Sequence, residues 1–310
     1  NAQADEIALV PNTTAGIGFV AEGLPWQPGE NVVIAANEFP SNQYPWLNLA
    51  SRGVEVRRVA PRGTAIEPAD VAAACDDRTR IVALSWVGYA TGWRIDPAEM
   101  AAVAHARGAL FLLDAIQGLG VFPLDVQATG VDFFAADGHK WMLGPEGAGL
   151  LFVRADRLEL LRPVGVGWNS VVAAHDFAHI EARWRPAASR YEGGSQNMVG
   201  FHGLGASLDL LAELGLGPSD SPLADAVLDA AAHAADRLRG IGAEIHSPTD
   251  DAHRSGIVAF SFPQRDPQAL RAACLEKQVA LACRDGRLRI SPHAYNNTDD
   301  VDRLMEALSQ

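Results

Sequence analysis

The sequence predicts an α/β protein, built as a three-layer, mainly parallel sheet with helices on both faces and followed by a small α+β domain. Two observations predict the sheet. Short apolar runs alternate with helical patterns through the first two hundred residues, and several runs are apolar at every position, as parallel strands covered on both faces are. This alternation of apolar runs and helical patterns then ends, so we expect a large domain at residues 1–222 and a smaller one at 223–310.

Seven strands and four helices are expected in the first part. The predicted strands are Glu6–Val10, Val32–Ala36, Val54–Val59, Ile81–Trp86, Ala109–Leu113, Val131–Ala136 and Ala148–Val153. The predicted helices are Ala15–Leu24, Asn42–Arg52, Pro68–Ala74 and Pro97–Ala106. In such sheets ligands gather outside the carboxyl ends of the strands, so polar residues just after each run are the first functional candidates.

The second part begins with a stretch of little periodicity. Residues 163–197 are rich in Gly, Trp and Arg, which is typical of a long functional loop. A helix is expected near Gly203–Leu214 from its Leu and Ala spacing, and the helix breakers of Gly215–Pro222 mark a boundary. Beyond it we expect an amphipathic helix from Leu223, strands at Glu244–His246, Ile257–Phe262, Val279–Cys283 and Leu288–Ile290, and a last helix to Leu308 capped by Thr298.

Composition excludes some classes of protein. A net charge of −13 argues against a nucleic-acid partner, and the apolar runs are too short to span a membrane. Cys75, Cys274 and Cys283 form no CxxC pair, so a reducing cytoplasm is the expected location. The chain opens with Asn1 and shows no signal peptide; we expect that something ahead of it was removed by processing or by the choice of boundary.

The strongest chemical candidate is Lys140. A predicted buried strand ends in Asp137-Gly138-His139-Lys140, and a glycine-rich turn follows. A lysine between a histidine and a tryptophan at a strand end is partly shielded from water, which lowers the ammonium pKa and yields the neutral amine that forms Schiff bases. An ordinary loop lysine is the alternative, and the neighbouring motifs weigh against it.

Two further motifs accompany this lysine. Asp114 follows a predicted strand, with Gln117 three residues later; such an Asp keeps the ring nitrogen of pyridoxal phosphate (PLP) protonated in PLP enzymes, although it could equally cap a helix. Asn12-Thr13-Thr14 lies between a strand and a helix, where hydroxyls and free N–H groups suit a phosphate. An ordinary helix cap is the alternative there.

In their order and spacing, these motifs resemble the class V aminotransferase group of fold type I PLP enzymes, which includes cysteine desulfurases, kynureninase and isopenicillin N epimerase. The resemblance runs from Asn12 to Leu308. It implies a Schiff base between PLP and Lys140, beside His139. For the rest of the cofactor it implies phosphate contacts from Asn12, Thr13 and Thr14, ring stacking by Phe39, and contacts of Asp114 and Gln117 with the ring nitrogen and phenolic oxygen.

The same resemblance implies a substrate site and a dimer. Arg289 matches the arginine that binds the substrate carboxylate, a role suited to its planar fork, and Tyr89 is expected to touch the cofactor or the substrate, or to be core. Ser195 lies in a segment that crosses to the partner subunit, so a homodimer with shared active sites is implied. Asp137 departs from the family pattern, because a carboxylate there repels phosphate unless it is turned away or paired.

The sequence defines the reaction less closely than it defines the cofactor. An aminotransferase or lyase acting on an amino acid is the first reading, with an epimerase or racemase and a cysteine desulfurase-like enzyme as alternatives. A desulfurase needs a cysteine on a mobile loop ahead of the carboxylate arginine, whereas Cys283 joins a strand directly to the Arg289 motif. We therefore expect Cys283 to be a buried structural thiol and the protein not to be an efficient desulfurase.

Other classes of protein fit the sequence less well. Family members carry a segment ahead of the Asn12 turn that this sequence lacks, so a truncated, catalytically impaired scaffold is an alternative; retention of Asp114, Lys140 and Arg289 argues against it. A nicotinamide enzyme would need a GxGxxG motif after the first strand, which is missing. His175 and His179 lie in a stretch without helical patterning, so no metal site is expected.

Overall fold

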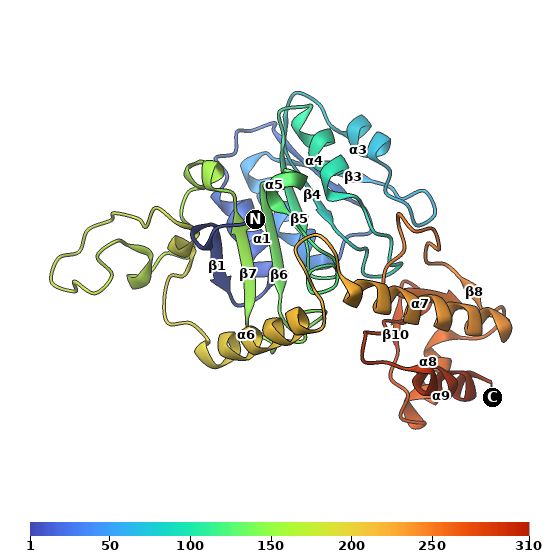
Figure 1. Cartoon of the computed structure of the whole chain (residues 1–310). Coiled ribbons are helices and arrows are strands. Elements are labelled where there is room, and N and C mark those ends of the chain that lie inside the picture. Colours follow the sequence, from blue (N-terminus) through green and yellow to red (C-terminus); the bar gives the residue numbers. More distant parts are fainter. Residues whose placement is uncertain (310) are drawn as a thin grey trace.

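The computed structural model describes residues 1–309 and contains a large sheet of seven strands and a small sheet of four (Figure 1). The large sheet has the order β1-β7-β6-β5-β4-β2-β3. Its strands are β1 (Ile7–Val10), β2 (Asn31–Ala35), β3 (Glu55–Val59), β4 (Thr79–Ser85), β5 (Leu110–Asp114), β6 (Phe133–Asp137) and β7 (Gly149–Val153). Strands β2 to β6 run parallel, and β7 is antiparallel to both β6 and β1. The predicted mainly parallel sheet is confirmed.

Helices cover both faces of this sheet. They are α1 (Thr13–Gly23), α2 (Tyr44–Leu47), α3 (Pro68–Ala74), α4 (Pro97–His105), α5 (Val126–Thr129) and α6 (Met198–Glu213). Because successive side chains of a strand point to opposite faces, Phe111 and Leu113 of β5 enter the core under α3, α4 and α6, whereas Leu110 and Leu112 enter the core under α1 and α2. The three layers follow directly from runs that are apolar at every position.

Helix α1 packs unusually close to β6. A Cβ atom at Gly16 would lie 2.8 Å from the Cβ of Ala135, a separation that real side chains do not tolerate. Glycine at this position therefore lets the first turn of α1 approach the sheet beside the carboxyl end of β6. This contact sets the distance between the Asn12 turn and the residues that follow β6.

The small sheet is antiparallel and has the order β10-β11-β9-β8. Its strands are β8 (Glu244–Ile245), β9 (Val258–Ser261), β10 (Ala282–Arg284) and β11 (Arg287–Ile290), and its helices are α7 (Pro222–Gly240), α8 (Pro267–Glu276) and α9 (Thr298–Leu308). Phe260 and Leu288 are fully buried in the core between this sheet and the helices. Helix α8 was not predicted, although Asp266 caps it and Pro267 opens it, which are ordinary start signals.

Several predicted boundaries were wrong. The strand expected at Val279–Cys283 is β10, which begins only at Ala282. The helix expected at Asn42–Arg52 is broken into 3₁₀ turns around the short helix α2, which has a proline in its first turn. Helix α6 begins five residues earlier than expected, because the Asn197 side chain accepts a hydrogen bond from Gly200 N at 3.0 Å. The cap of α9 is Asn297 and not Thr298, since Asn297 accepts from Asp300 N at 3.1 Å.

Residues 163–197 form the loop that the sequence predicts. Within the described part of the chain, this loop contains the short 3₁₀ turns Trp168–Ser170 and Ala188–Tyr191 and an isolated antiparallel bridge between Val171 and Trp184. It reaches well away from the sheet, on the side opposite the small sheet (Figure 1). No helix among residues 1–309 has the length and apolar character needed to cross a membrane.

Candidate active site

The site lies at the carboxyl ends of the central parallel strands. Ser85 and Asp114, the last residues of β4 and β5, are paired in register, and Asp114 is paired with Ala135 of β6. Lys140 follows three residues after β6 ends at Asp137. The parallel register therefore carries Asp114 and the turn with Lys140 to one edge of the sheet, as the sequence predicts.

Lys140 is half-buried, and its amine lies against an aromatic ring. Its Nζ atom is 5.6 Å from the centroid of the Phe39 ring. Burial lowers the pKa of the Lys140 ammonium, and the positive charges of Arg289 and Arg284 lower it further, against the opposing charges of Asp114 and Asp137. The environment thus favours the neutral, nucleophilic amine.

Asp114 is a buried carboxyl group with few partners. It is 2% exposed, and its Oδ1 accepts a hydrogen bond from Ile116 N at 3.2 Å. Burial raises the pKa of Asp114 to about 6, against the opposing effects of the Ile116 N–H and of Lys140. Turn residues and not a helix follow Asp114, so it does not serve as a helix cap. A cationic group beside it would stabilise its ionised form.

Glu38 is a second buried carboxyl group here, and the sequence reasoning missed it. It is 5% exposed, and it accepts hydrogen bonds from Ser85 N at 2.8 Å and from Ser85 Oγ. Burial raises the pKa of Glu38 to about 7, and the nearby charge of Asp114 contributes to the rise. Glu38 follows β2, so the rule that selected Asp114, polar residues just after strands, could have found it.

Gln117 and Trp141 link the two strand ends. Trp141 Nε1 donates a hydrogen bond to Gln117 Oε1 at 2.8 Å, and both side chains are buried, with Gln117 7% exposed. Because the amide oxygen of Gln117 is occupied, its amide nitrogen keeps two donors for another group. Gln117 is therefore held as a hydrogen-bond donor at this site.

The Asn12 turn has one polar atom without a partner. Asn12 caps α1, since its Oδ1 accepts from Ala15 N at 2.9 Å, and Thr14 Oγ1 donates to Ser41 Oγ at 2.7 Å. Thr13 Oγ1 is buried and has no hydrogen-bond partner. A buried hydroxyl at a helix N-terminus suits an anion, which would also meet the positive end of the helix dipole.

Phe39, Tyr89 and Arg289 close the site from the other side. Phe39 is 41% exposed, and its ring meets the edge of the Tyr89 ring at a centroid distance of 5.2 Å. Arg289 Nη1 donates to the Tyr89 carbonyl oxygen, while Arg289 Nε is buried without a partner. Burial lowers the pKa of Arg289, and the nearby Arg284 lowers it further. Arg289 thus retains donors for a ligand.

Asp137 lies against a histidine side chain. Its Oδ2 is 3.1 Å from His139 Nδ1, although neither that nitrogen nor Asp137 Oδ1 has a hydrogen bond of good geometry. The carboxylate that the sequence singled out as a departure therefore lies beside His139 but forms no hydrogen bond of good geometry with it.

Ser195 and Cys283 are less buried than the carboxyl groups described above. Ser195 is exposed, just ahead of α6. Cys283 is half-buried and not buried as expected, because it sits in the short strand β10 and not within a longer apolar strand. It pairs with Leu288, whose side chain enters the small core, whereas Arg289 pairs with Ala282 and points to the other face.

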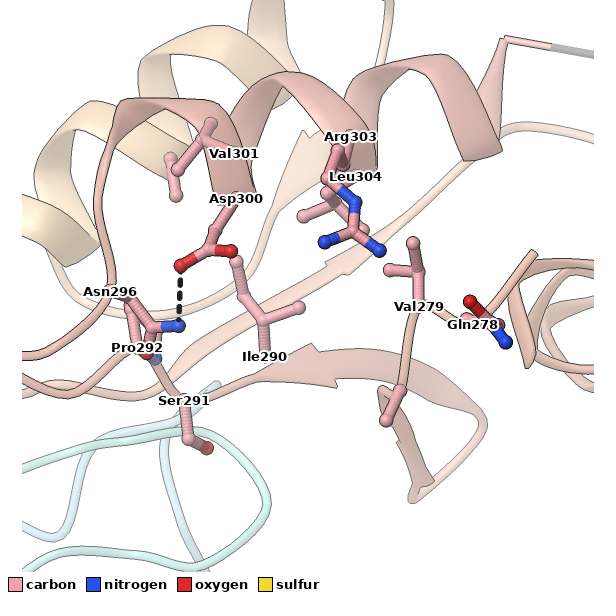
Figure 2. A pocket seen from close by; sticks show the side chains of 12 residues that line it. Gln278, Val279, Ile290, Ser291, Pro292, Asn296, Asp300, Val301, Arg303 and Leu304 are labelled. Carbon is pink, nitrogen blue, oxygen red and sulfur yellow. Dashed lines mark hydrogen bonds between the residues drawn. The ribbon is translucent and has the colours of Figure 1, made fainter.

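The motif after Arg289 also shapes a cavity in the small sheet. This cavity of about 210 Å³ lies between α9 and β11 and is lined by Ser291, Pro292 and Asn296 (Figure 2). Asn296 Nδ2 donates to Asp300 Oδ2 at 3.0 Å, and Asn296 Oδ1 accepts from His293 N at 2.9 Å. Asn296 therefore holds the turn that follows β11. No group of three or more potential metal ligands occurs among residues 1–309.

The fold is that of fold type I PLP enzymes. The class-V aminotransferase family profile matches residues 1–304, and the chain belongs to this family. A probable cysteine desulfurase from Methanothermobacter thermautotrophicus is 33% identical over 330 residues, which cover 100% of this chain and 80% of that protein. A cysteine desulfurase from Klebsiella pneumoniae is 32% identical, over 99% of this chain and 78% of that protein.

Solved structures of related proteins have the same fold. The cysteine desulfurase CsdA from Escherichia coli superposes with a TM-score of 0.88 at 26% identity, covering 99% of this chain and 78% of that one. A mutant of C-DES, with glycine covalently linked to its PLP cofactor, has a TM-score of 0.92 at 24% identity, covering 100% and 82%; this likeness concerns the fold. The chain is a PLP-dependent class V enzyme, and its relatives favour the desulfurase-like alternative over the aminotransferase reading.

Proposed function

We propose that the chain holds PLP on Lys140 Nζ and catalyses a lyase-type reaction at Cβ of an α-amino acid, related to that of cysteine desulfurases. The observation that carries this proposal is the meeting of Lys140 and buried Asp114 at adjacent strand ends. Relatives named cysteine desulfurases support the lyase reading.

The residues of the site fit the cofactor. Thr13 Oγ1 and the first N–H groups of α1 would hold the phosphate, since this hydroxyl is buried without a partner. Asp114 would face the ring nitrogen, Gln117 would donate to the phenolic oxygen, and Phe39 would cover the ring. Bound PLP supplies an aldehyde that condenses with amines and a ring that accepts electron density from the substrate.

Each residue of the site would have its own role in the reaction. The Lys140 amine would serve as the base for the proton on the substrate Cα, a role that its lowered pKa favours. Arg289 binds the substrate carboxylate through its free donors. Asp114 would face the ring nitrogen, and a proton on that nitrogen would favour the ionised form of Asp114. The leaving group departs from Cβ with its bonding electron pair.

We also propose that the leaving group departs without attack by a thiolate of this chain. Cys283 lies on the hairpin face that carries Leu288 into the small core, whereas Arg289 lies on the opposite face. The other two cysteines, Cys75 and Cys274, are buried. Elimination, followed by hydrolysis of the remaining fragment to a keto acid and ammonia, needs no such thiolate.

A homodimer is part of this proposal. Several large apolar side chains of the 163–197 loop are exposed, among them Phe177 at 71% and Ile180 at 92%. Exposed apolar side chains gathered on one segment mark an interaction surface, and a second copy of the chain would also bring Ser195 to its neighbour's phosphate site. Light scattering after gel filtration is expected to give twice the chain mass, and a monomer that retains full activity would contradict it.

The reaction is tested with the PLP-loaded protein and a panel of amino acids. We expect equal amounts of keto acid and ammonia to be released from a substrate with a leaving group at Cβ, and none with Lys140→Ala. Keto acid released without ammonia, together with conversion of the cofactor to its amine form, would identify an aminotransferase instead. Incorporation of solvent deuterium with no net loss of substrate would identify an epimerase.

A further inference from the structure

The hairpin that carries Arg289 is built tightly. Strands β10 and β11 are joined by Asp285 and Gly286, whose φ angles of 50° and 71° both lie in the left-handed region, as in a two-residue hairpin turn. Register pairs Arg284 with Arg287 and Ala282 with Arg289. Since alternate residues share a face, this turn gathers three arginines on the face opposite Leu288.

That face is turned toward the candidate active site. Arg289 Nη1 donates to the carbonyl oxygen of Tyr89, whose ring contacts Phe39. Arg284 lies close enough to Lys140 to help lower its pKa, after burial and the charge of Arg289. Arg284 and Arg289 are thus neighbours of the same amine.

The three arginines differ in their partners. Arg287 Nη1 lies 3.6 Å from the carboxylate of Asp285. Arg284 donates only to the carbonyl oxygen of Cys283, at 2.9 Å, and neither Arg284 nor Arg289 forms a salt bridge with any residue of the described range 1–309. Two guanidinium groups near Lys140 therefore have no carboxylate partner among residues 1–309, and both would attract a bound anion.

We propose that Arg284 binds a second anionic group of the substrate, so that the enzyme acts on α-amino acids with an acidic side chain. This inference rests on the proposed function, in which Arg289 takes the α-carboxylate. With one anion at each arginine, the substrate neutralises both charges. Arg284 is exposed at the end of β10, so its long side chain can follow side chains of different length.

The test compares isosteric pairs of amino acids, aspartate with asparagine and glutamate with glutamine. Each is titrated into the PLP-loaded protein, and Kd is taken from the change in the cofactor's absorption. We expect the acidic member to bind about tenfold more tightly or better, the gain typical of a charge-assisted hydrogen bond. Arg284→Gln should abolish this preference, and Arg284→Lys should restore part of it.

Arg287→Gln is the matched control, because Arg287 shares the hairpin face but has Asp285 as its partner; it should keep the preference. Equal affinity for acid and amide in the wild type, or a preference that survives Arg284→Gln, would overturn the inference while the absorption band of bound PLP leaves the proposed function intact. A wild-type protein that shows no such band would overturn the proposed function itself.

Discussion

Trp141 donates a hydrogen bond to Gln117, with 2.8 Å between Nε1 and Oε1. The residue next to Lys140 is thereby tied to the residue three positions after Asp114, across two neighbouring strand ends. The bond fixes the amide so that its nitrogen is left to donate. Without it, the buried amide of Gln117 could rotate and present its oxygen, an acceptor, to the phenolic oxygen of the cofactor.

Trp141→Phe should therefore weaken PLP binding. We expect the Kd of the apoprotein for PLP to rise about fivefold to tenfold, the value of one buried hydrogen bond, as measured by fluorescence or calorimetric titration. Trp26→Phe is the control, because it removes an indole hydrogen bond to Ala21 at the end of α1. Equal effects of the two variants would mean that the Gln117 contact has no special part in binding.

Glu38 should make the stability of the apoprotein depend on pH. Its pKa is raised in the folded state to about 7, so the folded protein holds this proton more tightly than the unfolded chain does. The stabilisation is complete below the unfolded pKa of about 4.5 and is lost as pH rises through about 7. A shift of this size corresponds to about 3 kcal/mol in the free energy of unfolding.

Glu38→Gln should remove the part of this dependence that lies near pH 7 and leave the part that comes from Asp114, whose pKa is raised to about 6. The amide keeps the shape of the side chain but does not ionise, so urea unfolding between pH 4.5 and 8 should give a flatter profile than in the wild type. Glu146→Gln, at an exposed position, is the control and should leave the profile unchanged. An unaltered profile in Glu38→Gln would show that this carboxyl group does not cause the pH dependence of stability.

Cys283→Ser should leave turnover nearly intact. Cys283 pairs with Leu288 on the face of the hairpin opposite Arg289, so its thiol is not directed at a substrate held by that arginine. Product release from each active amino acid is measured in the wild type and the variant at equal PLP loading. Loss of sulfide release from cysteine in the variant would contradict this prediction and establish desulfurase chemistry by a thiolate.

Substitutions in α1 test whether its close packing against β6 positions the Asn12 turn. Gly16→Ala places a methyl group 2.8 Å from Ala135 Cβ, which should cost about 1–3 kcal/mol through overpacking and weaken PLP binding by moving the N-terminus of α1. Gly18→Ala lies on the same helix with open space around it, so it should stabilise by about 0.5–1 kcal/mol. Similar melting temperatures for the two variants would contradict this account of the α1–β6 contact.

The sequence was informative where one local signal decides the structure. Strands β4 to β6 each contain a run of four consecutive apolar residues, so their place in a covered parallel sheet, and with it the meeting of Asp114 and Lys140, could be predicted. Helix α8 was missed because its apolar stripe is thin, although Asp266 and Pro267 announce its start.

Long-range contacts could not be predicted in the same way. The bonds of Glu38 with Ser85 and of Gln117 with Trp141 join residues on different strands, and no local pattern specifies such partners. The pairing of Asp137 with His139 depends on side-chain rotation within a turn. Whether Cys283 is buried depends on the length of β10, which is shorter than its apolar surroundings suggest.

The central claim is the covalent attachment of PLP to Lys140 beside Asp114. The most direct measurement is reduction of the PLP-loaded protein with borohydride, followed by proteolysis and mass spectrometry. We predict a phosphopyridoxyl group on the peptide that contains Lys140, and no stable label in Lys140→Ala. A label on another lysine, or none in a wild-type protein incubated with excess PLP, would contradict the account.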